Sequence, residues 1–294
     1  MKKSFKKTFI FIGILFILLK IGTSIAQEKE KFKEISLKPS GEVKQGQTVF
    51  INIKSPEKLV NPAFVFNNKK YKLFNSGENQ YSGLLGVEAL TNPGTYTISL
   101  TDETGNLKDQ AIIKVSEKKF PSQNIAVSKG TAGLTATQHE NNQINRMKTT
   151  VTDDLLGAVP PYNSPTAGCI NSVFGVKRYY NGKFSGNYHK GIDIRANKGV
   201  PVKSITDGKI LFAEFFRLHG GSVAVDHGQG LVSLYIHLSK IDVKAGDKVT
   251  SGQKVGEVGS TGFATGPHLH WGLYVHGTSI DPMTDWIKPV TICK

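Results

Sequence analysis

Three short stretches carry residue types that can bind a metal ion and hydrolyse a bond. The first is His189-Lys190-Gly191-Ile192-Asp193. Ile192 and Ile194 alternate with Asp193 as on a β-strand, and positions four apart on a strand share one face. An imidazole and a carboxylate on one face suit zinc, which binds such ligands at about 2.0–2.2 Å. Taken alone, a surface histidine and a turn aspartate would give the same pair.

The second and third stretches are His268-Leu269-His270 and Tyr235-Ile236-His237-Leu238. Two histidines two positions apart on a strand point the same way, so one can bind a metal while the other moves a proton. His237 ends an apolar stretch, where a core or edge histidine is the simpler interpretation. The hypothesis of a hydrolytic site rests on all three stretches occurring in order within residues 166–290.

Residues 166–290 are expected to form an antiparallel β domain that positions these side chains. Short apolar alternations such as Val223-Ala224-Val225 are separated by glycine-containing turns, for example at Asp207-Gly208 and Ser251-Gly252-Gln253. No sustained helical period occurs in this region. The glycine-rich Gly256-Glu257-Val258-Gly259 lacks the lysine of a phosphate-binding loop.

The remainder of the chain is expected to contain a second β domain. In residues 33–117, Val49, Ile51 and Ile53 alternate with polar residues, and turn-forming residues such as Asn92-Pro93-Gly94 separate the strands. The pattern predicts an immunoglobulin-like β-sandwich. Residues 118–165 are expected to be a linker with a polar, helical stretch over residues 139–156. The fold class is therefore all-β.

The N-terminus has the features of an export signal. Residues 1–26 combine a basic start with an apolar run of 11 residues, Phe9 to Leu19, and a small-residue end before Gln27. The run is shorter than the roughly 20 residues of a membrane span. We expect a cleaved signal peptide, no stable membrane insertion after cleavage, and a location in the periplasm, the cell envelope or outside the cell; a retained anchor is the alternative.

Charge and cysteine content restrict the partners and the metal chemistry. The net charge is +14, and five of these charges lie in residues 1–26, which leaves +9 for the rest of the chain. Basic proteins favour polyanions, but no basic stripe with interleaved aromatic residues indicates nucleic acid. Cys169 and Cys293 are the two cysteines, too few for a cysteine-based zinc finger. Export favours a disulfide between them, with two free thiols as the alternative.

Residues 174–282 resemble the catalytic domain of the lysostaphin/LytM-type zinc endopeptidases. The matching pieces, in order, are Phe174-Gly175, HKGID at 189–193, GVPV at 199–202, DG at 207–208, DHGQGL at 226–231, YIHL at 235–238, GDKV at 246–249, GQKVGEVGSTG at 252–262 and TGPHLHWG at 265–272.

The resemblance implies that His189, Asp193 and His270 bind one Zn²⁺ per chain, with His237 and His268 as unligated catalytic residues. It implies a zinc metalloendopeptidase that hydrolyses peptide cross-links of bacterial peptidoglycan, with the stem peptides as partners and a LytM-type catalytic domain as the fold. A catalytically inactive wall-binding or hydrolase-activating module is the alternative.

The other four histidines are expected to stand outside this chemistry. His227 is assigned to a turn or to a position behind the metal ligands. His219 and His276, in glycine-flanked loops, are expected to be exposed, and His139 is expected to be solvated.

Overall fold

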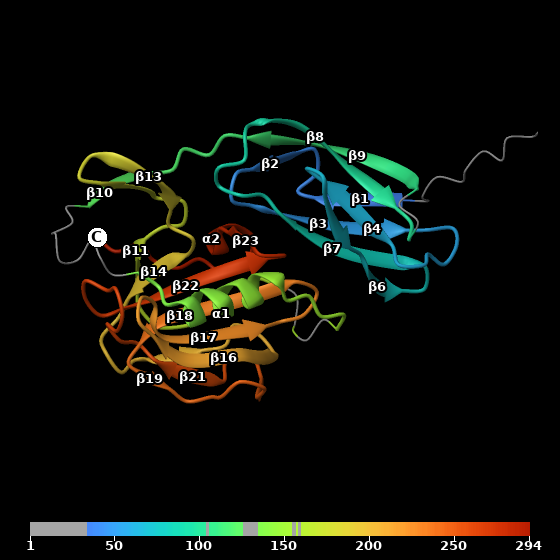
Figure 1. Cartoon of the computed structure of the whole chain (residues 1–294). Helices are drawn as coiled ribbons and strands as arrows, with labels where there is room; N and C mark the ends of the chain where they lie inside the picture. Colours follow the sequence, from blue (N-terminus) through green and yellow to red (C-terminus); the bar gives the residue numbers. More distant parts are fainter. Residues whose placement is uncertain (1–33, 104–105, 126–134, 155–156, 158–159) are drawn as a thin grey trace, which may run out of the picture. The chain divides into compact units, whose positions relative to one another are not determined.

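The computed structural model describes residues 34–103, 106–125, 135–154, 157 and 160–294, and almost all of its regular structure is β-strand (Figure 1). The expected signal peptide, residues 1–26, lies outside the described residues. Neither helix in the described part of the chain is long and apolar enough to cross a membrane.

Residues 34–116 form a two-sheet sandwich, as the sequence predicts. One sheet has the order β1 (Glu34–Lys38), β3 (Thr48–Lys54), β7 (Gln80–Gly86), β6 (Phe74–Gly77). The other has the order β2 (Glu42–Lys44), β9 (Leu107–Ser116), β8 (Gly94–Thr101), β4 (Ala63–Phe66), β5 (Lys69–Lys72).

The alternation seen in the sequence places the apolar side chains of the sandwich in its core. Val49, Ile51 and Ile53 of β3 are at most 2% exposed and belong to one buried cluster with Ile98 and Leu100 of β8. Successive side chains of a strand point to opposite faces, so one face of each sheet forms this core. The sequence of residues 34–116 contains no histidine.

The C-terminal domain is organised around one antiparallel sheet. Its order is β11 (Cys169–Ser172), β14 (Ile192–Arg195), β22 (His268–Val275), β18 (Leu231–Leu238), β17 (Gly220–Asp226), β16 (Gly208–Phe216), β20 (Lys248–Val249), and β23 (Thr278–Ile280) also pairs with β22. A smaller sheet contains β15 (Pro201–Lys203), β21 (Lys254–Glu257) and β19 (Lys240–Ile241), and α2 (Pro282–Asp285) follows β23.

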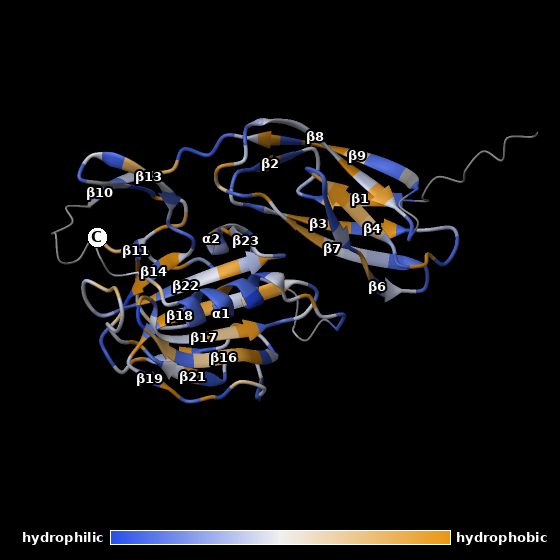
Figure 2. Cartoon of the chain, viewed as in Figure 1, coloured by the Kyte–Doolittle hydropathy of each residue, from blue (hydrophilic) through white to orange (hydrophobic). Residues whose placement is uncertain are grey.

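Both faces of the main sheet are covered, which is why every residue of β17 and β18 is buried. On one face, Leu231 and Tyr235 of β18 join the main core cluster. On the other face, Val232, Leu234 and Ile236 pack in a second cluster that includes Met147 of α1 (Gln138–Thr149). Figure 2 shows the hydrophobic residues of β17 in the middle of this sheet.

Two elements of residues 118–165 associate with the C-terminal domain. The strand β10 (Ser122–Ile125) pairs in parallel with β12 (Lys177–Tyr180), which pairs with β13 (Lys183–Tyr188). The helix α1 begins with a capping box, in which the Thr137 hydroxyl accepts from the Glu140 amide and the Glu140 carboxylate accepts from the Thr137 amide. Figure 1 shows α1 lying across the main sheet.

Hydrogen bonds and core packing also connect the sandwich and the C-terminal domain, and the described residues from position 34 onwards belong to one compact unit. The Nε1 atom of Trp286 donates to the Thr48 hydroxyl over 3.0 Å, and the Asp281 amide donates to the Gly46 carbonyl over 2.7 Å. Ala89 of the sandwich belongs to the main core cluster of the C-terminal domain.

Cys169 and Cys293 form a disulfide, which is the alternative that the sequence favoured. The bond joins the first strand of the main sheet to the C-terminal tail. The tail is also held by backbone hydrogen bonds from Ile170 to Thr291 and from Cys293 to Ile170.

Candidate metal centre

Asp193 and His270 are cross-strand neighbours at the centre of the candidate site. Asp193 of β14 pairs in register with His270 of β22. Ile192 and Ile194 are fully buried on the opposite face of β14, and this alternation turns the Asp193 carboxylate towards the His270 side. His189 lies in the connection that follows β13 and is 1% exposed. Two antiparallel strands and one connection therefore position the three side chains.

Three ligand atoms from these residues meet at one point. The Asp193 Oδ1 atom lies 3.0 Å from His189 Nε2 and 2.9 Å from His270 Nδ1, and the two ring nitrogens are 2.9 Å apart. Ligands at about 2.0 Å from a tetrahedral zinc ion stand about 3.3 Å from one another. The three donors are therefore spaced closely enough to hold one metal ion, and they are the types that zinc prefers.

The surroundings fix the orientation of the candidate ligands. The Nδ1 atom of His189 lies 2.8 Å from the Val173 carbonyl, so a proton on Nδ1 leaves Nε2 free to bind a metal. Gly191 allows the chain to approach β22, because an added Cβ atom would stand 2.4 Å from the Trp271 carbonyl oxygen and 2.9 Å from His270 Nε2. A larger residue at position 191 would displace one of the ligand rings.

Electrostatics keep Asp193 and His270 in the protonation states that metal binding requires. Burial raises the pKa of Asp193, but its close contacts with the His189 and His270 imidazoles outweigh burial and hold that pKa well below its usual range. Burial lowers the pKa of His270 to about 4, although Asp193 acts in the opposite direction. At neutral pH Asp193 is thus ionised and His270 is neutral.

His237 and His268 stand next to the candidate ligands. Their ring centroids are 4.9 Å apart, and the His237 ring lies 6.3 Å from that of His270. The Nδ1 atom of His237 is 2.8 Å from the Thr261 carbonyl, and the Nδ1 atom of His268 is 2.8 Å from the Gly266 carbonyl. A carbonyl accepts but cannot donate, so each Nδ1 carries the proton and each Nε2 is an acceptor.

The environment also keeps His237 uncharged. Burial lowers the pKa of His237 to about 3, and the neighbouring His270 acts in the same direction. A neutral imidazole with an acceptor nitrogen can take a proton from a water molecule. The cluster thus places two imidazoles beside a group that could hold one cation, an arrangement that suits hydrolysis of an amide.

The remaining histidines include two for which the sequence expectation was wrong. His276 is 7% exposed and contacts Tyr71 and Phe74, and the His219 side chain is 25% exposed because it is held by the Glu140 carboxylate. Both were expected to be exposed, but a glycine-flanked loop can still be covered by residues distant in sequence. His139 is 61% exposed, yet its ring lies 2.7 Å from the Glu214 carboxylate.

His227 lies in the core, away from the candidate ligands. It is fully buried, with Nδ1 2.8 Å from the Asp207 carbonyl and Nε2 2.7 Å from the Ser233 hydroxyl. The Ser233 hydroxyl is in turn 3.0 Å from the Tyr235 hydroxyl. His227 therefore belongs to a buried hydrogen-bond network of the sheet.

Sequence reasoning missed the groups that orient the histidines. These are the backbone carbonyls of Val173, Thr261, Gly266 and His219, which accept from His189, His237 and His268. A carbonyl group has no residue-type signature, so the sequence holds no direct signal for them. The capping-box pattern Thr137-x-x-Glu140 was a further signal for the start of the helix that covers the sheet, beside the helical stretch expected from residue 139.

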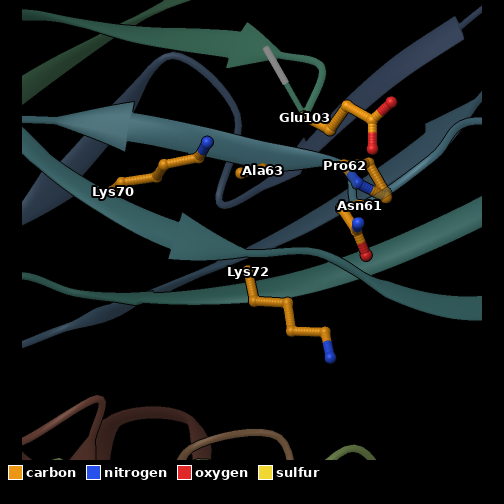
Figure 3. A pocket seen from close by; sticks show the side chains of 6 residues that line it. All are labelled: Asn61, Pro62, Ala63, Lys70, Lys72 and Glu103. Atoms are coloured by element: carbon orange, nitrogen blue, oxygen red, sulfur yellow. The ribbon is translucent and has the colours of Figure 1, made fainter. Parts of the chain in front are cut away.

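A hollow of about 630 Å³ on the sandwich contains none of the clustered histidines. Figure 3 shows its six lining side chains, which are Asn61, Pro62, Ala63, Lys70, Lys72 and Glu103. Lys72 is paired with Asp153 at 2.6 Å. The ionisable side chains of the hollow, Lys70, Lys72 and Glu103, are not among the candidate metal ligands, so the hollow is separate from the candidate metal centre.

Comparison with known proteins places the histidine cluster in a recognised sequence family. Residues 187–282 match the family described as Peptidase family M23. Peptidoglycan DD-endopeptidase ShyA of Vibrio cholerae is 36% identical over 131 residues, which cover 45% of this chain and 30% of that protein. Lysostaphin of Staphylococcus simulans is 42% identical over 105 residues, which cover 34% of this chain and 21% of that protein.

A solved structure extends the likeness beyond the matched region. A Pseudomonas aeruginosa protein, described as a candidate M23 peptidase, is 25% identical with a TM-score of 0.61, and the match covers 81% of this chain and 92% of that chain. The match with the first curated relatives is shorter, since the chain spans about 30% of their length or less.

Proposed function

Because the C-terminal domain of this chain belongs to peptidase family M23, we propose that the protein is a zinc-dependent endopeptidase that hydrolyses peptide cross-links of bacterial peptidoglycan. The proposal is carried by one observation: His189, Asp193 and His270 bring three ligand atoms together, and the His237 and His268 rings lie next to this group. Two of the similar proteins are named as a peptidoglycan endopeptidase and lysostaphin.

In this proposal His189, Asp193 and His270 hold one Zn²⁺ and leave a position for water. The bound ion would lower the pKa of water and polarise the carbonyl of the scissile peptide bond. Asp193 supplies the one negative charge among the three ligands, and the hydrogen bond to the Val173 carbonyl keeps the His189 ring in place.

His237 and His268 transfer protons in the proposed reaction. Each presents an acceptor Nε2 because its Nδ1 proton is committed to a backbone carbonyl. One imidazole accepts the proton of the attacking water, and a protonated imidazole donates to the departing amine and to the negative oxygen of the tetrahedral intermediate. Because burial keeps His237 uncharged at neutral pH, its Nε2 atom is free to accept a proton.

The proposed site of action is the bacterial envelope. The basic, apolar N-terminus and the net charge of +9 for residues 27–294 favour export and association with anionic wall polymers. The sandwich has no reactive cluster among its described residues and is proposed to act as a binding or spacing module.

The test compares purified wild-type protein, His189→Ala and the control His139→Ala, which removes an imidazole outside the cluster. Zinc content is measured by atomic absorption, and soluble fragments released from purified peptidoglycan are identified by mass spectrometry. We expect one zinc per chain and new amino termini at cross-link positions for wild type and control. His189→Ala should lose both, and full wall hydrolysis by the zinc-free variant would refute the proposal.

A further inference from the structure

Glu140 is a buried carboxylate with no part in the proposed reaction. It is 0% exposed, and its oxygens accept from the backbone amides of Thr137 (3.3 Å), Leu218 (3.3 Å) and His219 (2.9 Å) and from Nδ1 of His219. Burial raises the pKa of Glu140, but hydrogen bonds from His219 and Leu218 outweigh it and hold the pKa below its ordinary value. A buried anion is tolerated only when it is satisfied in this way.

The turn that Glu140 holds is connected directly to His237. The carbonyl of His219 accepts the backbone amide of His237 over 3.0 Å, and the carbonyl of Leu218 accepts the amide of Phe263 over 2.8 Å. Phe263 follows closely on Thr261, whose carbonyl accepts Nδ1 of His237. Both hydrogen bonds that orient His237 therefore involve segments tied to the Leu218–His219 turn.

The conformation of His237 requires such support. Its φ angle is +65°, in the left-handed region that is unfavourable for a residue with a side chain. A strained backbone of this kind persists only where the surrounding structure holds it. The end of the Leu218–His219 turn also lies close to the segment that carries Thr261, because a Cβ atom on Gly220 would stand 2.3 Å from the Thr261 hydroxyl oxygen. This close packing helps to hold the backbone of His237.

We propose that Glu140 is a positioning residue for His237: by fixing the Leu218–His219 turn, it sets where the Nε2 atom of His237 stands beside the candidate ligands. Helix α1 then belongs to the reactive structure of the C-terminal domain, although it comes from the segment between the two domains. The inference rests on the proposed function, because it assigns a role to a residue that supports one of the proton-transferring imidazoles.

The chain offers matched controls on the same helix. His139 and Gln143 flank Glu140 but bind the carboxylate of Glu214 on β16, at 2.7 Å and 3.0 Å, and not the turn. Glu140→Gln keeps the size of the side chain but turns an NH₂ group towards N–H donors. His139→Ala and Gln143→Ala remove contacts of α1 and leave the turn intact.

The kinetic test uses the full mature chain with zinc and soluble cross-linked muropeptides. We expect Glu140→Gln to retain one zinc per chain and a KM within about twofold of wild type, while kcat falls roughly 10- to 100-fold because His237 is displaced. The two controls should keep kcat within about twofold. A Glu140→Gln variant with the kinetics of the controls would overturn the inference.

A second readout does not depend on activity. Nitrogen-15 NMR of the His237 imidazole, recorded without substrate, should show displaced ring signals in Glu140→Gln and unchanged signals in both controls. If the wild-type chain hydrolysed nothing, the proposed function would fail, and this comparison would still decide the positioning role. If Glu140→Gln did not fold, Glu140→Asp, which draws the carboxylate back from the turn, would replace it, and unaltered His237 signals in that variant would refute the inference.

Discussion

The buried His227 makes the stability of the C-terminal domain sensitive to acid. Burial lowers the pKa of His227 from 6.5 to about 4, because a charged imidazole would be fully desolvated. The unfolded chain therefore binds a proton near pH 6.5, whereas the folded chain binds it only near pH 4. The contribution of neutral His227 to stability is complete above pH 6.5 and decreases as the pH falls. Between pH 7 and 4.5 the expected loss is about 2 kcal/mol.

The measurement compares wild type with His227→Gln, whose side chain does not titrate. Urea unfolding is followed at several pH values with a chelator present throughout, so that the metal ligands contribute equally to both proteins. The variant can be less stable at every pH, and the slope of the unfolding free energy against pH is what tests the reasoning. Between pH 7 and 4.5 the unfolding free energy of wild type should fall by about 2 kcal/mol more than that of His227→Gln. Parallel curves for the two proteins would show that His227 does not titrate as described.

Three further predictions concern the catalysis and the packing. His237→Ala should bind one zinc per chain but lose at least about 100-fold in kcat, since it removes a proton-transferring group and no ligand; unchanged fragment release by mass spectrometry would contradict this. Met147→Ala should lower the free energy of unfolding by about 2–5 kcal/mol, because Met147 is 1% exposed against the sheet; a loss below about 0.5 kcal/mol in urea would argue against helix docking. Replacing both Cys169 and Cys293 by serine should lower the free energy of unfolding by about 4–5 kcal/mol, since the disulfide closes a loop of 124 positions. An unchanged melting temperature would exclude this stabilisation by the disulfide.

Strand periodicity predicted the fold class because it is a local signal. The alternation at Val49, Ile51 and Ile53 identified the core face of β3, and the alternation of Ile192 and Ile194 about Asp193 identified the face of β14 that carries the carboxylate. The sequence also favoured the disulfide between Cys169 and Cys293. The strand faces followed from neighbouring residues within one strand. The disulfide followed from the presence of two cysteines in the chain.

Contacts between distant segments could not be predicted in the same way. The exposure expected for His276 was wrong because Tyr71 and Phe74, about 200 positions earlier, cover it. The Glu140 carboxylate meets Leu218 and His219 through backbone amides, which have no residue-type signature. The parallel pairing of β10 with β12 likewise depends on main-chain groups that every residue carries.

Family resemblance predicted from the sequence that four histidines and one aspartate form one site, and the structure adds their geometry. These residues are His189, Asp193, His237, His268 and His270. Residue spacing alone left His189 and Asp193 open to a simpler interpretation. The register between β14 and β22, which pairs Asp193 with His270, is a property of the folded sheet. Orientation by the Val173 and Thr261 carbonyls is also visible only after folding.

The most direct test of the account is anomalous diffraction at the zinc absorption edge from crystals of the zinc-loaded chain. We expect one strong peak per chain, within about 2.0–2.2 Å of Nε2 of His189, Nδ1 of His270 and a carboxylate oxygen of Asp193, with no fourth protein ligand. A peak elsewhere, or a zinc ion that His237 or His268 also binds, would contradict it.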